Sequence, residues 1–71
     1  MDKLEKGTIF SVTIDQKIEY WKIIGDLNKS FFSRGGSYPV VECDVNGNEF
    51  KRMRTFYQKY IKNHAVIISK G

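Results

Sequence analysis

Cys43 and His64 are the two most reactive side chains of this sequence, and each residue type occurs once. Nucleophilic catalysis needs such a pair oriented by a third group, and a metal site needs three or more ligands. The alternation around Cys43 places its thiol on the apolar side of a predicted strand, whereas His64 follows a predicted helix. We therefore expect a buried thiol and an unrelated loop imidazole, with no catalytic residue, no metal site and no cofactor.

The carboxylates and the glycines also lack the spacing of an active site. Asp15, Asp26 and Asp44 are scattered through predicted turns, whereas catalysis by paired carboxylates needs two groups that converge on one bond. Gly35-Gly36 is followed by neither a helix nor the Lys-Ser/Thr of a phosphate-binding loop. These patterns favour a binding protein over an enzyme.

A cluster of five cations within twelve residues, interleaved with two tyrosines, is the strongest functional signal. Its members are Lys51, Arg52, Arg54, Tyr57, Lys59, Tyr60 and Lys62. Cations along a strand with rings for stacking are typical of single-stranded nucleic-acid binding, and salt-sensitive phosphate contacts are typical of duplex binding. The net charge of +4 permits either ligand. The alternative interpretation is a solvated lysine face next to aromatic rings that belong to the core.

A second group of residues supports a different class of function, a module that docks on another protein. Its members are Tyr20, Phe31, Phe32, Arg34 and Tyr38. Tight protein interfaces usually depend on a few aromatic and arginine anchors, and the neighbouring glycines predict a flexible loop. The alternative is a loop with one core phenylalanine.

The 71 residues are enough for one domain, which we assign to 1–71 with 1–6 as a loose lead-in. A lone cysteine excludes an internal disulfide, which favours a reducing compartment such as the cytoplasm. The charged start lacks the apolar core of a signal peptide, and no run approaches the length of a membrane span. We expect a cytoplasmic protein that does not enter a membrane.

The first half of the chain predicts three strands. Apolar and polar residues alternate over 8–14, a polar turn follows at 15–17, and 18–25 is rich in aromatic and β-branched residues. A short returning strand is expected at 29–33. The register of 18–25 stays open, because either Trp21 with Ile23 or Tyr20 with Ile24 faces the core.

The Asn46-Gly47 pair between two alternating runs is the strongest short hairpin signal, since a two-residue type I′ turn needs positive φ at both positions. Such a turn sets Cys43 against Phe50 on the inner face and Glu42 against Lys51 on the outer face.

A three-residue turn would instead oppose Cys43 to Glu49, a less favourable pair, so we predict the two-residue turn. Val41, Cys43 and Val45 are then expected in the core. Arg52 and Arg54 share the inward direction of Phe50, which leaves open whether they reach solvent or lie partly covered at a rim.

After Met53 the apolar spacing changes to three and four, which predicts a short helix over 56–62. Its core-facing stripe is Met53, Phe56, Tyr57, Tyr60 and Ile61. Thr55 and Gln58 fit a capping box, and Asn63 is suited to a left-handed helix end. The apolar run 65–69 predicts a last strand that returns to the first.

The expected fold is mainly β, a small barrel of about five antiparallel strands with one short helix or 3-10 turn before the last strand. The order of GTIFSV, YPVVECDVNGNEFKRMR, TFYQKYIKN and AVIIS resembles the SH3-like small barrels that are common among phage and prophage accessory proteins. The acidic loop of proline-binding SH3 domains is missing here, so polyproline recognition is not implied. The resemblance implies a binding module, with a host protein as the partner if it is not nucleic acid. An open sheet edge would also permit a homodimer.

Overall fold

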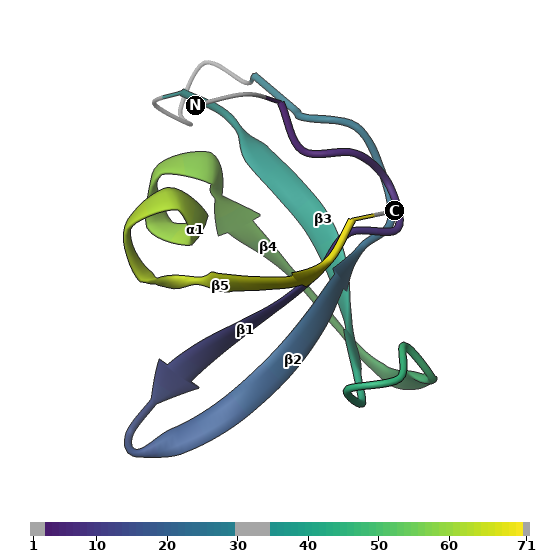
Figure 1. Cartoon of the computed structure of the whole chain (residues 1–71). Coiled ribbons are helices and arrows are strands. Elements are labelled where there is room, and N and C mark those ends of the chain that lie inside the picture. The colour runs from purple at the N-terminus through teal and green to yellow at the C-terminus, as the bar shows by residue number, and fades with distance from the viewer. Residues whose placement is uncertain (1–2, 30–34, 71) are drawn as a thin grey trace.

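The computed structural model describes residues 3–29 and 35–70, which form five strands and one short helix. In chain order the elements are β1 (Ile9–Ile14), β2 (Lys17–Ile23), β3 (Ser37–Cys43), β4 (Glu49–Tyr57), α1 (Gln58–His64) and β5 (Val66–Ser69). All strand pairs are antiparallel and belong to one sheet of order β4-β3-β2-β1-β5 (Figure 1). This confirms the mainly β prediction and the return of the last strand to the first.

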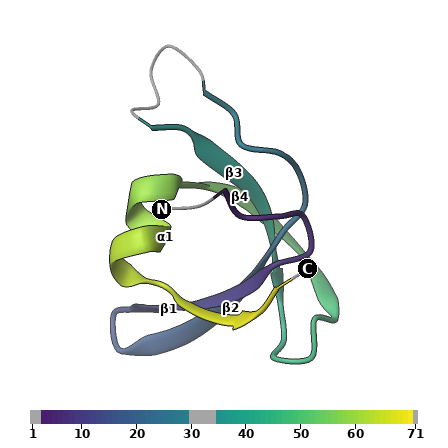
Figure 2. The same cartoon turned by 45° about the horizontal axis from the view of Figure 1, so that its top comes forward.

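The sheet is strongly curved, so that the β1–β2 and β3–β4 hairpins run in different directions across the molecule (Figure 1). Among the described residues, β4 and β5 are the two edges of this sheet. The helix α1 connects them and lies along the open side of the curve in both views (Figures 1 and 2). The helix therefore covers the part of the concave side that the sheet leaves open.

The core fills this concave side. It consists of Phe10, Val12, Trp21, Ile23, Tyr38, Val40, Phe56 and Ile61. Phe56 is its centre, with its ring 5.5 Å from Phe10 and 5.4 Å from Trp21, both edge to face. Trp21 and Ile23 are fully buried, which settles the register that the sequence left open for this strand.

The β1–β2 hairpin has a tight two-residue turn. Asp15 and Gln16 have φ values of 51° and 67°, and Ile14 pairs directly with Lys17. Positive φ at both central residues is the signature of the type I′ turn, whose twist matches that of the strands. The polar turn predicted here is confirmed, although the sequence did not reveal its type.

The turn of the β3–β4 hairpin is longer than the predicted one. The backbone N–H of Gly47 donates to the carbonyl of Asp44 at 3.0 Å, and the N–H of Asp44 donates to the carbonyl of Asn48 at 3.1 Å. Three residues thus close the hairpin, with positive φ at Gly47 alone among them. The two-residue turn was the wrong prediction.

The Asp44 carboxylate explains the longer turn. It accepts hydrogen bonds from the backbone N–H groups of Asn46 and Asn48, each at 2.9 Å, and from the Asn48 side-chain amide at 2.8 Å. Aspartate commonly stabilises turns in this way. These bonds lower the pKa of the Asp44 carboxyl, the Asn48 side chain being the largest cause.

The longer turn and a bulge change every pair predicted for this hairpin. Cys43 pairs with Glu49 and Val41 pairs with Met53, so the single residue 42 of β3 faces residues 50–52 of β4. The pair Cys43–Phe50 is therefore wrong, and Glu42 lies opposite a bulge that contains Lys51 instead of in a regular pair with it. The unfavourable position of Glu49 is relieved by Lys22, whose Nζ lies 3.1 Å from the Glu49 carboxylate.

The predicted inner residues of β3 are buried, but on the other face of the sheet from the core. Val41 and Cys43 are 4% and 2% exposed, while Val40, which alternates with them along the strand, belongs to the core cluster. The hairpin tip covers this second face, since a Cβ on Gly47 would lie 3.0 Å from Ile9 Cδ1.

Two further residues expected inside lie at the surface. Val45 is 51% exposed in the turn, and Phe50 is 52% exposed in the bulge. Both were assigned to the core from the alternation alone, which the turn and the bulge interrupt.

The helix starts later than predicted, because β4 continues to Tyr57. Met53 lies in the strand and is 64% exposed, so it is not part of the helical stripe. The capping box is also wrong, since the N-cap residue makes no side-chain cap bond and the N–H of Gln58 donates to the Gly36 carbonyl at 3.0 Å.

The helix ends without a left-handed residue, so the role predicted for Asn63 is wrong. The chain turns directly into extended structure at Ala65, whose N–H donates to the Ile61 carbonyl at 2.9 Å. Buried Ile61 is the residue that holds α1 on the core.

The segment before β1 lies against the sheet. The N–H of Leu4 donates to the hydroxyl oxygen of Tyr38 at 2.9 Å, and the N–H of Gly7 donates to the Ile23 carbonyl at 2.7 Å. Most of the strand predicted at 29–33 lies outside the described residues. In the part of the chain that is described, no helix has the length and apolar character to cross a membrane.

Candidate functional site

The cationic cluster lies on two consecutive elements at one edge of the sheet. We call the seven residues the β4–α1 surface: Lys51, Arg52, Arg54 and Tyr57 on β4, and Lys59, Tyr60 and Lys62 on α1. All of them are exposed except Tyr60, which is half-buried. The elements predicted to carry the cluster therefore bring its members onto one connected part of the molecule.

The two arginines lie on the core-facing side of β4 and still reach solvent. The Cζ atom of Arg52 lies 5.3 Å from the centre of the Trp21 ring, and that of Arg54 lies 5.7 Å from it. Arg54 also stacks over Phe56 at 4.5 Å. Cation–π contacts at exposed sites contribute about 0.5–1 kcal/mol each, so both side chains are ordered at the rim of the core.

The electrostatic environments of the two arginines differ. The Nη1 atom of Arg52 lies 3.8 Å from a carboxylate oxygen of Glu19 and 3.8 Å from one of Glu42. Two carboxylates thus partly compensate its charge, although exposed ion pairs of this length contribute less than about 1 kcal/mol to stability. Arg54 has no ion pair with any described residue. Arg54 is therefore the ordered cation whose charge is available to a ligand.

Aromatic rings continue from the arginines onto the helix. Tyr60 is stacked on Phe56 with ring centres 5.5 Å apart and planes 22° apart, and the His64 ring lies 4.7 Å from Tyr60. Tyr57 is 56% exposed. The rings of this region therefore differ in burial. Phe56 belongs to the core, Tyr60 packs against it, and Tyr57 is exposed to solvent.

The sequence that builds this surface has an unusual charge distribution. From Phe50 to Gly71 there are six lysines and arginines and no aspartate or glutamate. Glu49, just before, is paired with Lys22. The positive charge of the chain is therefore concentrated on β4 and α1, and long-range attraction of an anionic ligand would act there.

A pocket of about 200 Å³ opens within the β4–α1 surface. It is lined by Ile14, Arg54, Thr55, Phe56, Tyr57 and Tyr60. Three of these residues, Arg54, Tyr57 and Tyr60, belong to the cluster predicted from the sequence. Sequence reasoning missed Ile14, which reaches the pocket from the end of β1. Only the curvature of the sheet brings it there.

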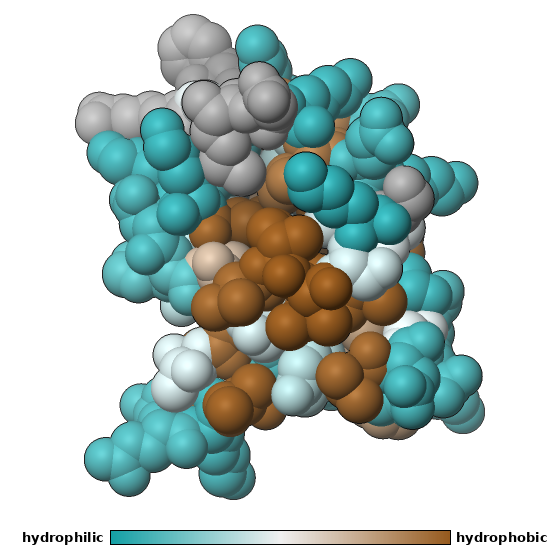
Figure 3. Space-filling view, viewed as in Figure 1, coloured by the Kyte–Doolittle hydropathy of each residue, from teal (hydrophilic) through white to brown (hydrophobic). Residues whose placement is uncertain are grey.

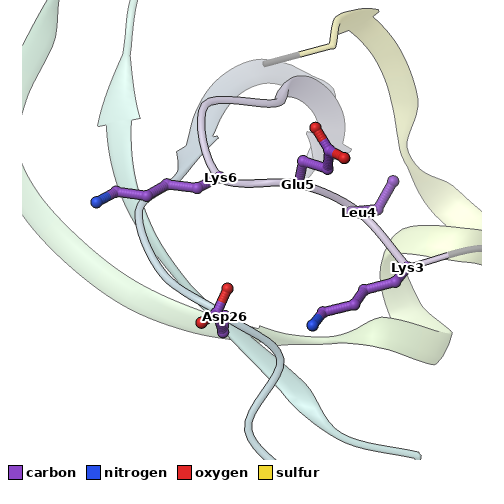
Figure 4. Close-up of a pocket in the computed structure, with 5 residues that line it drawn as sticks. All are labelled: Lys3, Leu4, Glu5, Lys6 and Asp26. Atoms are coloured by element: carbon purple, nitrogen blue, oxygen red, sulfur yellow. The ribbon is translucent and has the colours of Figure 1, made fainter.

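A larger pocket of about 390 Å³ lies beside the N-terminal segment and is lined by Lys3, Leu4, Glu5, Lys6 and Asp26 (Figure 4). Asp26 faces the 3–6 segment across this pocket (Figure 4). Two cations and two carboxylates line it, so it offers neither a net charge nor a cluster of flat rings. An adjoining pocket of about 280 Å³ shares Lys3, Leu4 and Glu5 with it and is also lined by Thr8 and Lys70.

Of the five residues expected to anchor a protein partner, the structure describes Tyr20 and Tyr38. Tyr38 is fully buried and its hydroxyl is bonded to the N-terminal segment, so it is not available for docking. Tyr20 is half-buried in β2. Phe31, Phe32 and Arg34 lie outside the described residues.

Exposed apolar side chains instead gather on β5, which sequence reasoning treated only as a closing strand. Val66, Ile67 and Ile68 are 63%, 37% and 41% exposed. Figure 3 shows an apolar region at the centre of the face that β5 crosses in Figure 1. The signal was present in the run of three apolar residues, which a strand covered on one face cannot bury completely.

The reactive residues lie in unrelated environments. Cys43 is buried in β3 next to Tyr20, and burial raises the pKa of its thiol while Lys22 opposes the shift. His64 ends α1 against Tyr60. Among the described residues, no group of three or more His, Cys, Asp or Glu side chains is placed to hold a metal ion.

Comparisons of the chain with protein-family models, curated proteins and solved structures find no match.

Proposed function

We propose that this protein is a small non-enzymatic module that binds nucleic acid through the β4–α1 surface. The observation that carries the proposal is Arg54, an exposed guanidinium held over Phe56 at 4.5 Å and paired with no carboxylate of residues 3–29 and 35–70. It lines the same pocket as Tyr57, whose side chain is exposed, on a surface whose sequence contains no acidic residue after Glu49. Ordered cations next to accessible rings are what nucleic-acid sites use.

The proposal assigns unequal roles to the cations. Arg54 is pre-organised and unopposed, whereas Arg52 must release Glu19 and Glu42 before it binds a phosphate. Lys59 and Lys62 are exposed on α1 and add mobile positive charge. Binding should therefore weaken steeply with salt, because each phosphate contact releases a counterion.

The test is the titration of a labelled oligonucleotide at low salt, followed by fluorescence anisotropy. We expect the double variant Arg52→Ala, Arg54→Ala to abolish binding, and Arg54→Ala alone to weaken it more than Arg52→Ala alone. Lys17→Ala, which removes an exposed cation from the β1–β2 hairpin, is the matched control and should bind nearly as wild type. Failure of the wild-type protein to bind any oligonucleotide at low salt would refute the proposal.

For the fold we propose an SH3-like small barrel of the phage accessory type. The sheet order β4-β3-β2-β1-β5 and the short helix between β4 and β5 support it. Closure of the barrel requires contact between the two edge strands, so cross-peaks between β4 and β5 protons in a nuclear Overhauser spectrum would test it. A cytoplasmic location fits a buried thiol that is not in a disulfide.

A phage-type factor that docks on a host protein is the second candidate. The exposed apolar strand β5, with Val66 63% exposed, is the observation that favours it, since contiguous apolar surface often marks an interaction site. A pull-down from cell lysate with and without nuclease separates the two. Partners lost on nuclease treatment support nucleic acid, and a protein retained by the wild type but not by Val66→Ser supports docking.

A further inference from the structure

The pocket inside the β4–α1 surface differs chemically from the two pockets beside the N-terminal segment. Its walls include the rings of Phe56, Tyr57 and Tyr60 and the guanidinium of Arg54, all of which have flat faces. No carboxylate lines it, whereas Glu5 lines both of the others. A ligand that fits it has apolar faces and tolerates, or carries, negative charge.

Four of the residues that line the pocket carry polar side-chain groups. Tyr57 and Tyr60 have phenol hydroxyls, Thr55 has a hydroxyl and Arg54 has guanidinium N–H groups. A planar ring that enters between such groups can stack on a face and exchange hydrogen bonds at its edge. Nucleobases combine a π-face for stacking with donors and acceptors along the edge.

The position of the pocket suits a base whose neighbouring phosphates are bound nearby. Arg54 belongs both to the pocket wall and to the cationic cluster, and Tyr60 belongs to the helix that carries Lys59 and Lys62. A chain that places one base in the pocket therefore runs past cations on either side of it.

We infer that the pocket binds one unpaired base of a single-stranded nucleic acid, stacked against Tyr57 and the Arg54 guanidinium. The inference rests on the proposed function and deepens it, because a base in a duplex has both faces covered by its neighbours and cannot enter without being flipped out. Single strands are the preferred ligand, and the lysines of α1 hold the flanking phosphates.

The experiment compares two labelled ten-nucleotide strands, oligothymidylate and an abasic strand with the same phosphates and no bases. Wild-type protein is expected to bind the strand with bases about tenfold more tightly, within the range that stacking of one base gives. Tyr57→Ala should remove this preference, because it removes a ring on which the base stacks. Because Tyr57 is largely exposed, this variant should fold, which circular dichroism checks.

Two variants serve as matched controls. Lys62→Ala removes an exposed charge outside the pocket, so it should weaken both strands equally and keep the tenfold preference. Arg54→Lys keeps the charge and loses the flat guanidinium, so it should reduce the preference for the strand with bases.

The outcomes separate the inference from the proposed function. Equal, salt-dependent binding of both strands by the wild type overturns the base pocket and leaves nucleic-acid binding intact. If the wild type binds neither strand, both the base pocket and nucleic-acid binding are refuted. A duplex that binds more tightly than the single strand, or thymidine monophosphate that binds as tightly as the strand, also overturns the inference, in favour of a duplex reader or a mononucleotide site respectively.

Discussion

The two hairpins of the sheet differ in the length of their turns and in the regularity of their strand pairing. In β1–β2 a two-residue turn joins strands that pair without interruption from Ile9–Lys22 to Ile14–Lys17. In β3–β4 a three-residue turn and a bulge leave residues 50–52 facing a single residue. The first hairpin supplies fully buried Phe10, Val12, Trp21 and Ile23. The second has a strand, β4, of which only Phe56 is buried.

This difference indicates a division of labour between stability and binding. A regular ladder keeps every second side chain on the core, which maximises burial. A bulge breaks that alternation and aims side chains elsewhere, and bulges are frequent next to functional sites. Here the bulge contains Arg52 and ends two residues before Arg54, so the irregular hairpin carries the candidate site at the expense of its own burial.

The same substitution in the two hairpins should give the largest contrast. Phe10→Ala removes a fully buried ring that packs against Phe56 and should cost about 3–5 kcal/mol. Phe50→Ala removes a ring that is 52% exposed and should change the free energy of unfolding by less than about 0.5 kcal/mol. Urea denaturation measures both.

Phe10→Ala approaches the whole stability of a domain of this size, roughly 4–10 kcal/mol, and is expected to be partly unfolded. Phe10→Leu, which keeps most of the volume, should cost less than about 1.5 kcal/mol and remain measurable. Equal costs for the Phe10 and Phe50 variants would contradict the division of labour.

The sequence predicted the regular hairpin better than the bulged one. Periodicity found β1, and the clustering of β-branched and aromatic residues found β2, since both strands obey the rules that such patterns express. It failed for Val45 and Phe50, because the three side-chain bonds of Asp44 select a turn that the Asn46-Gly47 signal does not predict.

The sequence predicted which residues of β4 and α1 belong to the candidate site, but not which residues of other strands contact them. The cations and tyrosines are neighbours in the chain, so the pattern identified them. The carboxylates opposing Arg52 and the pocket wall at Ile14 come from other strands. Contacts between distant segments, set by the bulge and the curvature, carry no signal in a local pattern.

Removing a glycine from one turn and adding a glycine to the other should change the free energy of unfolding in opposite directions. Gly47→Ala places a Cβ at φ +89° and 3.0 Å from Ile9 Cδ1, and should cost about 1–3 kcal/mol. Gln16→Gly removes a side chain held at φ 67° and should stabilise by about 0.5–1 kcal/mol, the relief of strain exceeding the added freedom of the unfolded chain. Thermal denaturation measures both, and two shifts of the same sign would disprove the turn assignment.

Acid should loosen the irregular hairpin. The pKa of Asp44 is lowered by its bonds to Asn48 and Asn46, so its contribution to stability is fully present above its ordinary value of about 3.9 and is lost as the pH falls through the lowered value. Asp44→Asn should therefore be less stable than wild type at pH 6, with the difference shrinking below about pH 4.

Melting curves between pH 6 and pH 2.5 measure this effect, the smallest of the three. Asp15→Asn, in the other turn, controls for the loss of one negative charge. A difference between wild type and Asp44→Asn that does not vary with pH would exclude the carboxylate as the cause.

The pairing of β1 with β5 also bears on the order of folding. Phe10 and Ile67 are partners in the sheet although they lie near opposite ends of the described chain. Loop-closure entropy makes such distant pairs late and slow to form. During synthesis, the outer edge of β1 stays without its partner until residues 66–69 have been added, so the nascent sheet passes through a stage in which an apolar strand edge is open to other chains.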